Sequence, residues 1–136
     1  MIDVRRLLVA TLRADPVIAP LLGATASDPR VYWYYQPSAE ISSTRQAYIT
    51  YAQTAFPPTD RSATGDPVFT LAICGLNIQV VETIRDRLVA LFDERQLATS
   101  AGRIIHGTRL AEHDSFQEHT KFAGRNMQFR FGFSKV

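Results

Sequence analysis

The segment LNIQVVETIRDRLVALFDERQ, residues 76–96, decides the class of fold. Its apolar residues recur at steps of three and four, which is typical of a helix that buries one face; they are Ile78, Val81, Ile84, Leu88 and Leu91. Asn77 stands immediately before this row, where its side chain can accept a backbone N–H of the first turn. We therefore predict a long amphipathic helix that packs on a sheet.

Segments rich in β-branched and aromatic residues lie on both sides of this helix and predict the strands of that sheet. They are RVYWYY (30–35), AYITYAQT (47–54), PVFTLAICG (67–75), GRIIHGTRLAE (102–112) and RNMQFRFGFSK (125–135). In the last strand an apolar row alternates with polar residues and is expected to face the long helix; it comprises Met127, Phe129, Phe131 and Phe133.

The N-terminal residues predict two further helices. Residues 2–14 place Val4, Leu7, Leu8 and Leu12 on one face, with Asp3 as a possible cap. Residues 15–23 form a shorter piece, with Asp15 as its N-cap candidate and Gly23 as its end. The predicted fold is a single α+β domain, residues 1–136: an antiparallel or mixed sheet of about five strands, covered on one face by the N-terminal helix and the long helix.

Composition limits the classes of function. Of the 136 residues, 46% are hydrophobic and 21% charged, which suits one folded domain. The net charge is +2 and the arginines are dispersed, so the electrostatic signature of a nucleic-acid binder is weak. Charged residues near the N-terminus and the lack of a long apolar run indicate neither a signal peptide nor a membrane span. We expect the chain to stay in the cytoplasm where it is made and to have no membrane partner.

Candidate catalytic and metal-binding residues are few. Glycine-rich phosphate motifs and the serine nucleophile motif Gly-x-Ser-x-Gly are absent from the sequence. Cys74 lies in an apolar strand, where a buried small hydrophobe is expected, and His106 is expected to be a packed or surface residue. Polar residues 112–124 predict a solvated loop, because His113 and His119 match no familiar metal-ligand spacing. We expect that the protein is not an enzyme and that it binds no metal and no cofactor.

The aromatic segment Tyr32-Trp33-Tyr34-Tyr35 leaves three interpretations open. A strand would send Tyr32 and Tyr34 to one face and the other two rings to the opposite face. Core packing is one interpretation. Stacking on single-stranded nucleic acid is the second, with charge supplied by Arg30 and Arg45. A subunit interface is the third, because Tyr and Trp are enriched in such contacts.

The order of these segments resembles that of the tail-completion, or tail-terminator, proteins of long-tailed bacteriophages and gene-transfer particles. The resemblance covers nearly the whole chain and is one of pattern and order. It is carried by LLVATLRADPVIAPLLG (7–23), RVYWYYQP (30–37), AYITYAQT (47–54), PVFTLAICGLNIQVVETIRDRLVALFDE (67–94) and IIHGTRLAEHDSFQEHTKFAGRNMQFRFGF (104–133).

The resemblance implies a structural role in the virion. Members of that family form a ring, typically hexameric, at the head-proximal end of the tail tube, where they stop polymerisation and join the head connector. The implied partners are other copies of the chain, the tail tube protein and the head connector or neck protein, with DNA only passing through the lumen. Because a closed ring joins two different surfaces of each subunit, one face of the aromatic segment becomes a candidate seam.

Further contact residues follow from the same resemblance. The loop at 56–66 is the candidate contact with the tail tube or connector, through Phe56, Asp60, Arg61 and Asp66. Arg125 and Arg130 are candidates for the lining of the lumen. The alternatives are a head-to-tail neck or stopper protein of the same family and, from another class, a small nucleic-acid-binding module.

Overall fold

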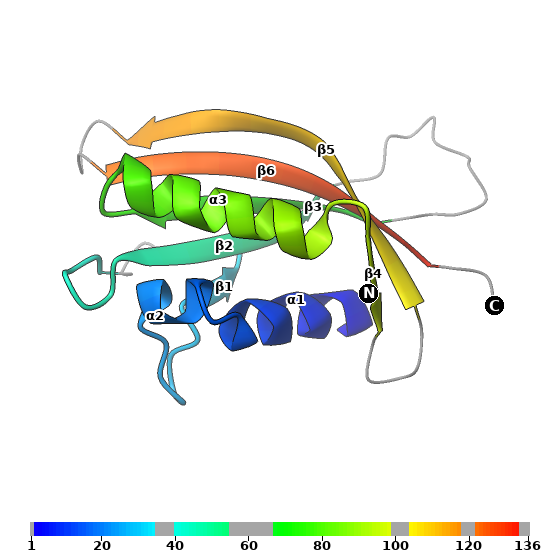
Figure 1. Ribbon diagram of the computed structural model, residues 1–136, viewed down its shortest axis with the longest axis horizontal. Coiled ribbons are helices and arrows are strands. Elements are labelled where there is room, and N and C mark those ends of the chain that lie inside the picture. The colour runs from blue at the N-terminus through cyan, green and yellow to red at the C-terminus, as the bar shows by residue number, and fades with distance from the viewer. Residues whose placement is uncertain (1, 35–39, 55–66, 99–103, 118–121, 134–136) are drawn as a thin grey trace.

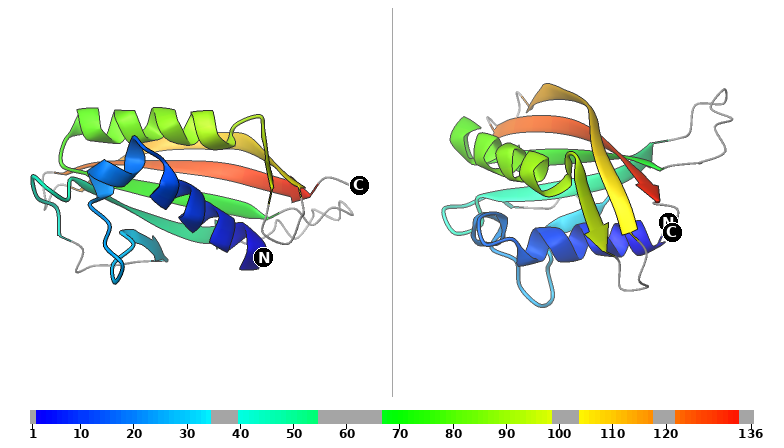
Figure 2. Two further views of the ribbon diagram at one scale, coloured as in Figure 1. Left: turned by 60° about the horizontal axis from the view of Figure 1, so that its bottom comes forward. Right: turned by 45° about the vertical axis from the view of Figure 1, so that its right-hand side comes forward.

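The computed structural model describes residues 2–34, 40–54, 67–98, 104–117 and 122–133. These residues form a curled six-stranded sheet, with the helices on one face (Figure 1; Figure 2). The α+β class is as predicted, but the sheet has one strand more than the five expected. The elements are α1 (Ile2–Ala14), α2 (Ile18–Leu22), β1 (Val31–Trp33), β2 (Ala47–Thr54), β3 (Val68–Gly75), α3 (Ile78–Phe92), β4 (Arg95–Ala98), β5 (Ile104–Gln117) and β6 (Phe122–Phe133).

The sheet has the order β1-β2-β3-β6-β5-β4 and is antiparallel except at its first pair. Strand β1 pairs in parallel with β2 and is shorter than the predicted strand 30–35. Both of its flanking residues have positive φ angles, 59° at Arg30 and 67° at Tyr34. This backbone conformation lies outside the β region, so the chain leaves the strand at each end.

The prediction of a polar loop at 112–124 was wrong for the residues that the structure describes. These residues belong to a long hairpin. Strand β5 continues to Gln117 and β6 begins at Phe122, with paired residues along both strands. Polarity misled the prediction here because the two strands pair charged and polar side chains across the hairpin. Asp114 stands opposite Arg125, and His113 stands opposite Asn126.

Strand β4 (Arg95–Ala98) is the additional strand, and its first two residues were predicted to belong to the long helix. Helix α3 ends at Phe92, and Glu94, with a φ of 57°, turns the chain into β4. The turn brings the Phe92 carbonyl so close to β5 that a Cβ on Gly107 would lie 2.1 Å from its oxygen. Only glycine fits this position without a shift of the backbone.

Helix α3 begins as predicted, because the Asn77 side chain accepts a hydrogen bond from the Val80 N–H at 2.9 Å. Its buried face differs from the predicted row at both ends, where Val80 and Phe92 replace Ile78 and Leu91. The buried residues are Val80, Val81, Ile84, Leu88 and Phe92. Ile78 is 70% exposed instead of buried, and Leu91 is only partly buried at the edge of the core.

The N-terminal helices follow the predicted pattern. Val4, Leu8 and Leu12 are fully buried, whereas the side chain of Asp3 lies outside the described part. Asp15 accepts hydrogen bonds from the N–H groups of Val17 and Ile18, which caps the turn that leads into α2. Gly23 ends α2 in the left-handed conformation, as predicted, with a φ of 62°.

One hydrophobic core lies between the sheet and the helices. The predicted apolar row of β6 faces α3: Met127, Phe129 and Phe131 are fully buried, while the Phe133 side chain lies outside the described part. The ring of Phe92 at the end of α3 packs edge-on, 5.8 Å from that of Phe129 and 5.7 Å from that of Phe131. Such burial and edge-to-face packing are the main stabilisation of a domain of this size.

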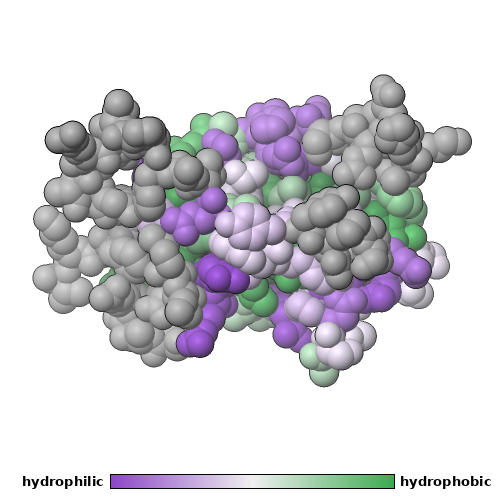
Figure 3. Space-filling model, turned by 180° about the vertical axis from the view of Figure 1, so that it is seen from behind, coloured by the Kyte–Doolittle hydropathy of each residue, from purple (hydrophilic) through white to green (hydrophobic). Residues whose placement is uncertain are grey.

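The opposite face of the sheet carries no helix in the described part of the chain. Its strands present mostly polar or small side chains that are partly exposed, among them Thr50, Ala72 and Gln128. Seen from behind, this open face is largely pale and hydrophilic (Figure 3). The sheet is therefore apolar towards the helices and polar towards its open face.

Candidate assembly surfaces

The aromatic segment divides between the two faces of the sheet. Trp33 lies on the helix side, with its ring 5.1 Å from that of Tyr51. Tyr32 lies on the open face, with its ring 6.2 Å from that of Tyr48. The predicted alternation ends there, because the positive φ of Tyr34 turns its ring onto Trp33 at 4.5 Å and leaves it 59% exposed. Tyr35 lies outside the described residues.

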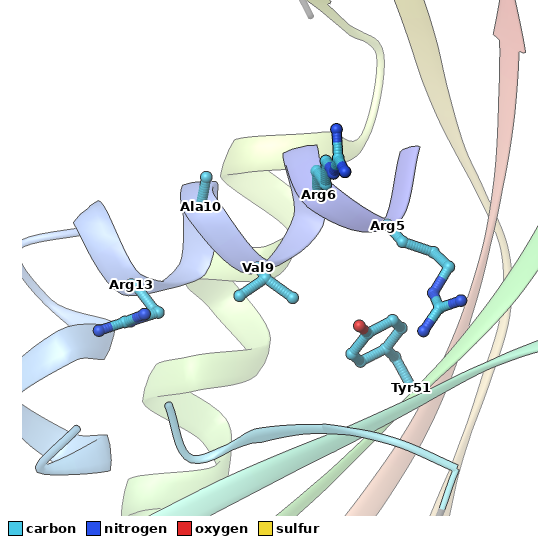
Figure 4. Close-up of a pocket in the computed structure, with 6 residues that line it drawn as sticks. All are labelled: Arg5, Arg6, Val9, Ala10, Arg13 and Tyr51. Atoms are coloured by element: carbon cyan, nitrogen blue, oxygen red, sulfur yellow. The ribbon is translucent and has the colours of Figure 1, made fainter. Parts of the chain in front are cut away.

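Arginines of α1 gather beside this aromatic cluster. A hollow of about 500 Å³ between α1 and β2 is lined by Arg5, Arg6, Val9, Ala10, Arg13 and Tyr51. In Figure 4, Arg5 reaches towards Tyr51, Val9 points into the space below the helix, and Arg13 lies at the far end. The Arg5 guanidinium lies 3.8 Å from the centre of the Trp33 ring, a cation–π contact.

No described carboxylate forms an ion pair with Arg5, Arg6 or Arg13. We call these three arginines, with the hollow beside them, the basic side. It combines positive charge that no described carboxylate pairs with and the apolar surface of Val9 and Ala10.

A second group of charged residues, with more carboxylates than guanidinium groups, lies farther along the same face of the sheet, where α3 meets β5. Arg85 binds Asp86 and Glu112, Arg109 contacts Asp93 and Glu112, and Arg125 binds Glu82 and Asp114. We call these residues the acidic side, because their five carboxylates outnumber their three guanidinium groups.

The ion pairs of the acidic side shift the pKa values of Glu112 and Arg125. Hydrogen bonds from Arg85 lower the pKa of Glu112, and hydrogen bonds to Glu82 and then Asp114 raise the pKa of Arg125. Asp86 and Asp114 keep 67% and 79% of their side chains exposed. Both carboxylates are therefore accessible to a neighbouring molecule.

Arg30 and Arg45 do not present free charge to a ligand, as the nucleic-acid interpretation requires. The Arg30 side chain is fully buried and donates to the carbonyl oxygens of Leu22, Glu40, Arg45 and Ala47. Arg45 is paired with Asp28. The sequence carried no signal for the burial of Arg30, because a strand-flanking arginine is normally exposed.

Asp28 organises the turn before β1. Its carboxylate accepts a hydrogen bond from the Tyr32 hydroxyl at 2.6 Å, and it also pairs with Arg45. These two contacts lower the pKa of Asp28, whereas burial and then the hydrogen bond to Asp28 raise the pKa of Tyr32. The Tyr32 hydroxyl, on one face of the aromatic segment, therefore has its hydrogen-bond partner within the chain itself.

The two arginines predicted to line a lumen lie on opposite faces of the sheet. Arg125 pairs in register with the buried Ile73 and contacts Glu82 of α3, so it lies on the helix side. Arg130 alternates with the buried Phe129 and Phe131 and is exposed on the open face. Phe56, Asp60, Arg61 and Asp66 of the predicted contact loop lie outside the described residues.

The histidine and cysteine candidates of the sequence form no metal-binding group among the described residues. His113 lies 3.2 Å from the Asn126 amide, and no group of three potential metal ligands occurs in this part of the chain; His119 lies outside it. Cys74 is buried as predicted, and burial raises the pKa of its thiol, which disfavours the reactive thiolate. None of the helices described is long and apolar enough to cross a membrane.

Comparison with known proteins identifies the fold. No family model and no curated protein sequence matches the chain. Among solved structures, a chain of the virion of a native gene transfer agent particle matches with a TM-score of 0.68 at 17% identity, over 98% of this chain and 96% of that one. A second matching structure, whose name describes no role, gives a TM-score of 0.57 at 13% identity, over 99% and 93%. The chain therefore shares its fold, over nearly its whole length, with a chain of a gene transfer agent virion.

Proposed function

We propose that this chain is a structural virion protein of a phage or gene-transfer particle, and that it acts as a tail-completion protein. In this role it forms a ring, of six copies in the proposed form, at the head-proximal end of the tail tube. The ring ends tube polymerisation and joins the tail to the head connector. The observation that carries the proposal is the end-to-end fold match to a chain of a gene transfer agent virion.

The arrangement of side chains supports an assembly role over catalysis. The described residues offer surfaces of contrasting character: an open polar sheet face, a basic side and an acidic side. Assembly into a ring requires such unlike surfaces on one subunit, whereas hydrolysis or group transfer requires a pocket with a nucleophile, base or metal.

The candidate contacts fall into three groups within this proposal. Tyr34, exposed beside Trp33, is the best placed of the aromatic residues to meet a neighbouring subunit. Phe56, Asp60, Arg61 and Asp66 remain the proposed contact with the tail tube protein or the connector. Arg130 suits a lumen through which DNA passes better than Arg125 does, because two carboxylates already neutralise Arg125.

A neck or stopper protein of the same family is the closest alternative, and disruption of the gene in a particle-producing cell separates the two. Loss of a tail terminator should give headless tails of uncontrolled length, because nothing stops the tube. Loss of a neck protein should give tails of normal length that do not join heads. Electron microscopy of the lysate distinguishes these outcomes, and normal infectious particles would contradict the virion role altogether.

A further inference from the structure

The basic and acidic sides lie at opposite ends of the sheet. Helix α1 lies below β1 and β2 in Figure 1, whereas the second half of β5 (orange), which carries Glu112 and Asp114, lies above β6; the first half of β5 (yellow) and β4 curl down towards the start of α1. A contact between copies that joined like sides would bring like charges together, which costs free energy. A contact that joined unlike sides would bring opposite charges together and leave a free side on each copy.

We propose that the basic side of one copy binds the acidic side of the next, head to tail. This inference deepens the proposed function and rests on it, since it names the two surfaces through which the copies meet. The occupant of the hollow beside Arg5, Arg6 and Arg13 is thus the acidic side of a second copy of this chain.

Charge complementarity is the first observation that favours a second copy as the occupant. The arginines of α1 have no carboxylate partner among the described residues, while the acidic side carries two carboxylates in excess of its guanidinium groups. Asp86 and Asp114 are the most exposed of these carboxylates and can reach a neighbour without breaking the ion pairs of Glu112.

Exposed apolar surface accompanies the charges on both sides. Ile78, at the first turn of α3, is 70% exposed and lies with Glu82, Asp114 and Arg125 around a hollow of about 220 Å³. Val9 and Ala10 line the hollow of the basic side. Each side therefore offers apolar area as well as charge, which is the usual composition of a protein contact.

One edge of β5 borders the acidic side. Among the described residues, β4 pairs only with residues 104–107 of β5, and the remaining residues of β5 pair with β6 alone. Leu110, at the register shift between Arg109 and Ala111, is 42% exposed. Charged side chains commonly protect such an edge from random pairing, and a neighbour of matching charge can still approach it.

Charge reversal tests the contact. Arg6→Glu with Arg13→Glu makes both sides acidic, and Asp86→Lys with Asp114→Lys makes both sides basic. Sedimentation velocity over a concentration series in 50 mM salt measures association of each full-length chain. We expect wild type to associate, and each double variant to raise the dissociation constant at least about 10-fold, because like charges then face each other.

An equimolar mixture of the two double variants tests whether complementary charges restore association. In that mixture native sides meet native sides and reversed sides meet reversed sides, so association should return to the wild-type level. The chain that carries all four substitutions should also associate with itself. A merely misfolded variant cannot be rescued in this way. Arg95→Glu with Arg130→Glu, which changes the net charge equally outside both sides, should associate like wild type.

Several results would overturn the head-to-tail contact. They are a wild-type chain that stays monomeric at every concentration, double variants that associate as wild type does, a mixture that fails to restore association, and a control variant that dissociates as the basic-side variant does. None of these results bears on whether gene disruption alters particles. Failure of this inference and failure of the proposed function are therefore separate observations.

Discussion

At the scale of single residues, the buried guanidinium of Arg30 joins segments that are distant in the chain. It donates to carbonyl oxygens at the end of α2, before β2 and at the first residue of β2. Its ring neighbour is Tyr48, 5.7 Å away. The bonds to the Leu22 and Ala47 carbonyl groups are buried, so these two acceptors depend most on Arg30.

Arg30→Met should therefore lower the free energy of unfolding by about 3 kcal/mol, because the variant removes the donor of the buried Leu22 and Ala47 carbonyl groups. Urea unfolding followed by circular dichroism measures the change. Arg130→Met, on the exposed open face, is the matched control and should stay within about 0.5 kcal/mol of wild type. Equal stability of the two variants would mean that the Arg30 contacts contribute nothing.

Asp15 should make stability depend on pH. Arg87 donates two hydrogen bonds to this buried carboxylate, at 2.5 and 3.2 Å, and holds its pKa below the ordinary value of 3.8. A lowered folded-state pKa gives a stabilisation that is complete above the unfolded-state pKa and disappears as pH falls through the folded-state value.

Asp15→Asn should cost about 2 kcal/mol at pH 7, through loss of the ion pair and weakening of the cap. Because asparagine does not titrate, the gap between variant and wild type should narrow as the pH falls below 4. Urea midpoints at pH 7, 5 and 3 measure this gap. A gap that stays constant over this range would exclude the Asp15–Arg87 pair as its source.

At the scale of elements, α3 depends on its N-cap. Asn77→Ala should destabilise the protein by about 1 kcal/mol, because the Val80 N–H loses its acceptor. Asn77→Asp keeps an acceptor and should remain close to wild type in stability. Gln79→Ala, at an exposed position two residues later in the first turn of α3, is the control. Urea unfolding of the three variants gives the order, and a neutral Asn77→Ala would contradict the capping role.

The elements that the sequence predicted well are those whose signal is local. The bounds of α1, the cap of α3 and the apolar row of β6 follow from the spacing of apolar residues and from capping chemistry. The extension of β5 could not be found in this way, because its residues around Asp114 are polar and their partners lie across the hairpin. The short β1 was equally hidden, since neither Arg30 nor Tyr34 is a residue type that signals a positive φ.

At the scale of the whole molecule, the sequence indicated an assembly protein but not its charged surfaces. The aromatic segment was visible as a contact candidate, which stays a prediction; Tyr34 is its most exposed described residue. The acidic side arises from pairs such as Arg85 with Glu112, which are 27 residues apart in the chain. Such a surface exists only after α3 has docked beside β5, so no local pattern announces it.

Two unlike sides at opposite ends of one sheet favour growth by repeated head-to-tail contact over a symmetric pair. If each contact rotates the next copy by a constant angle, the series closes into a ring or continues as a filament. A dimer with two-fold symmetry would bury the same surface of both copies, so no further copy could add through it. The form of the assembly therefore discriminates between the proposed role and other modes of association.

The most direct measurement is the mass of the purified chain in solution by multi-angle light scattering, with negative-stain images of the same fractions. The account predicts closed rings with a central hole and a mass of several copies of the 15.2 kDa chain, six in the proposed form. A mass of one or two copies at every concentration, with no ring in the images, would contradict it.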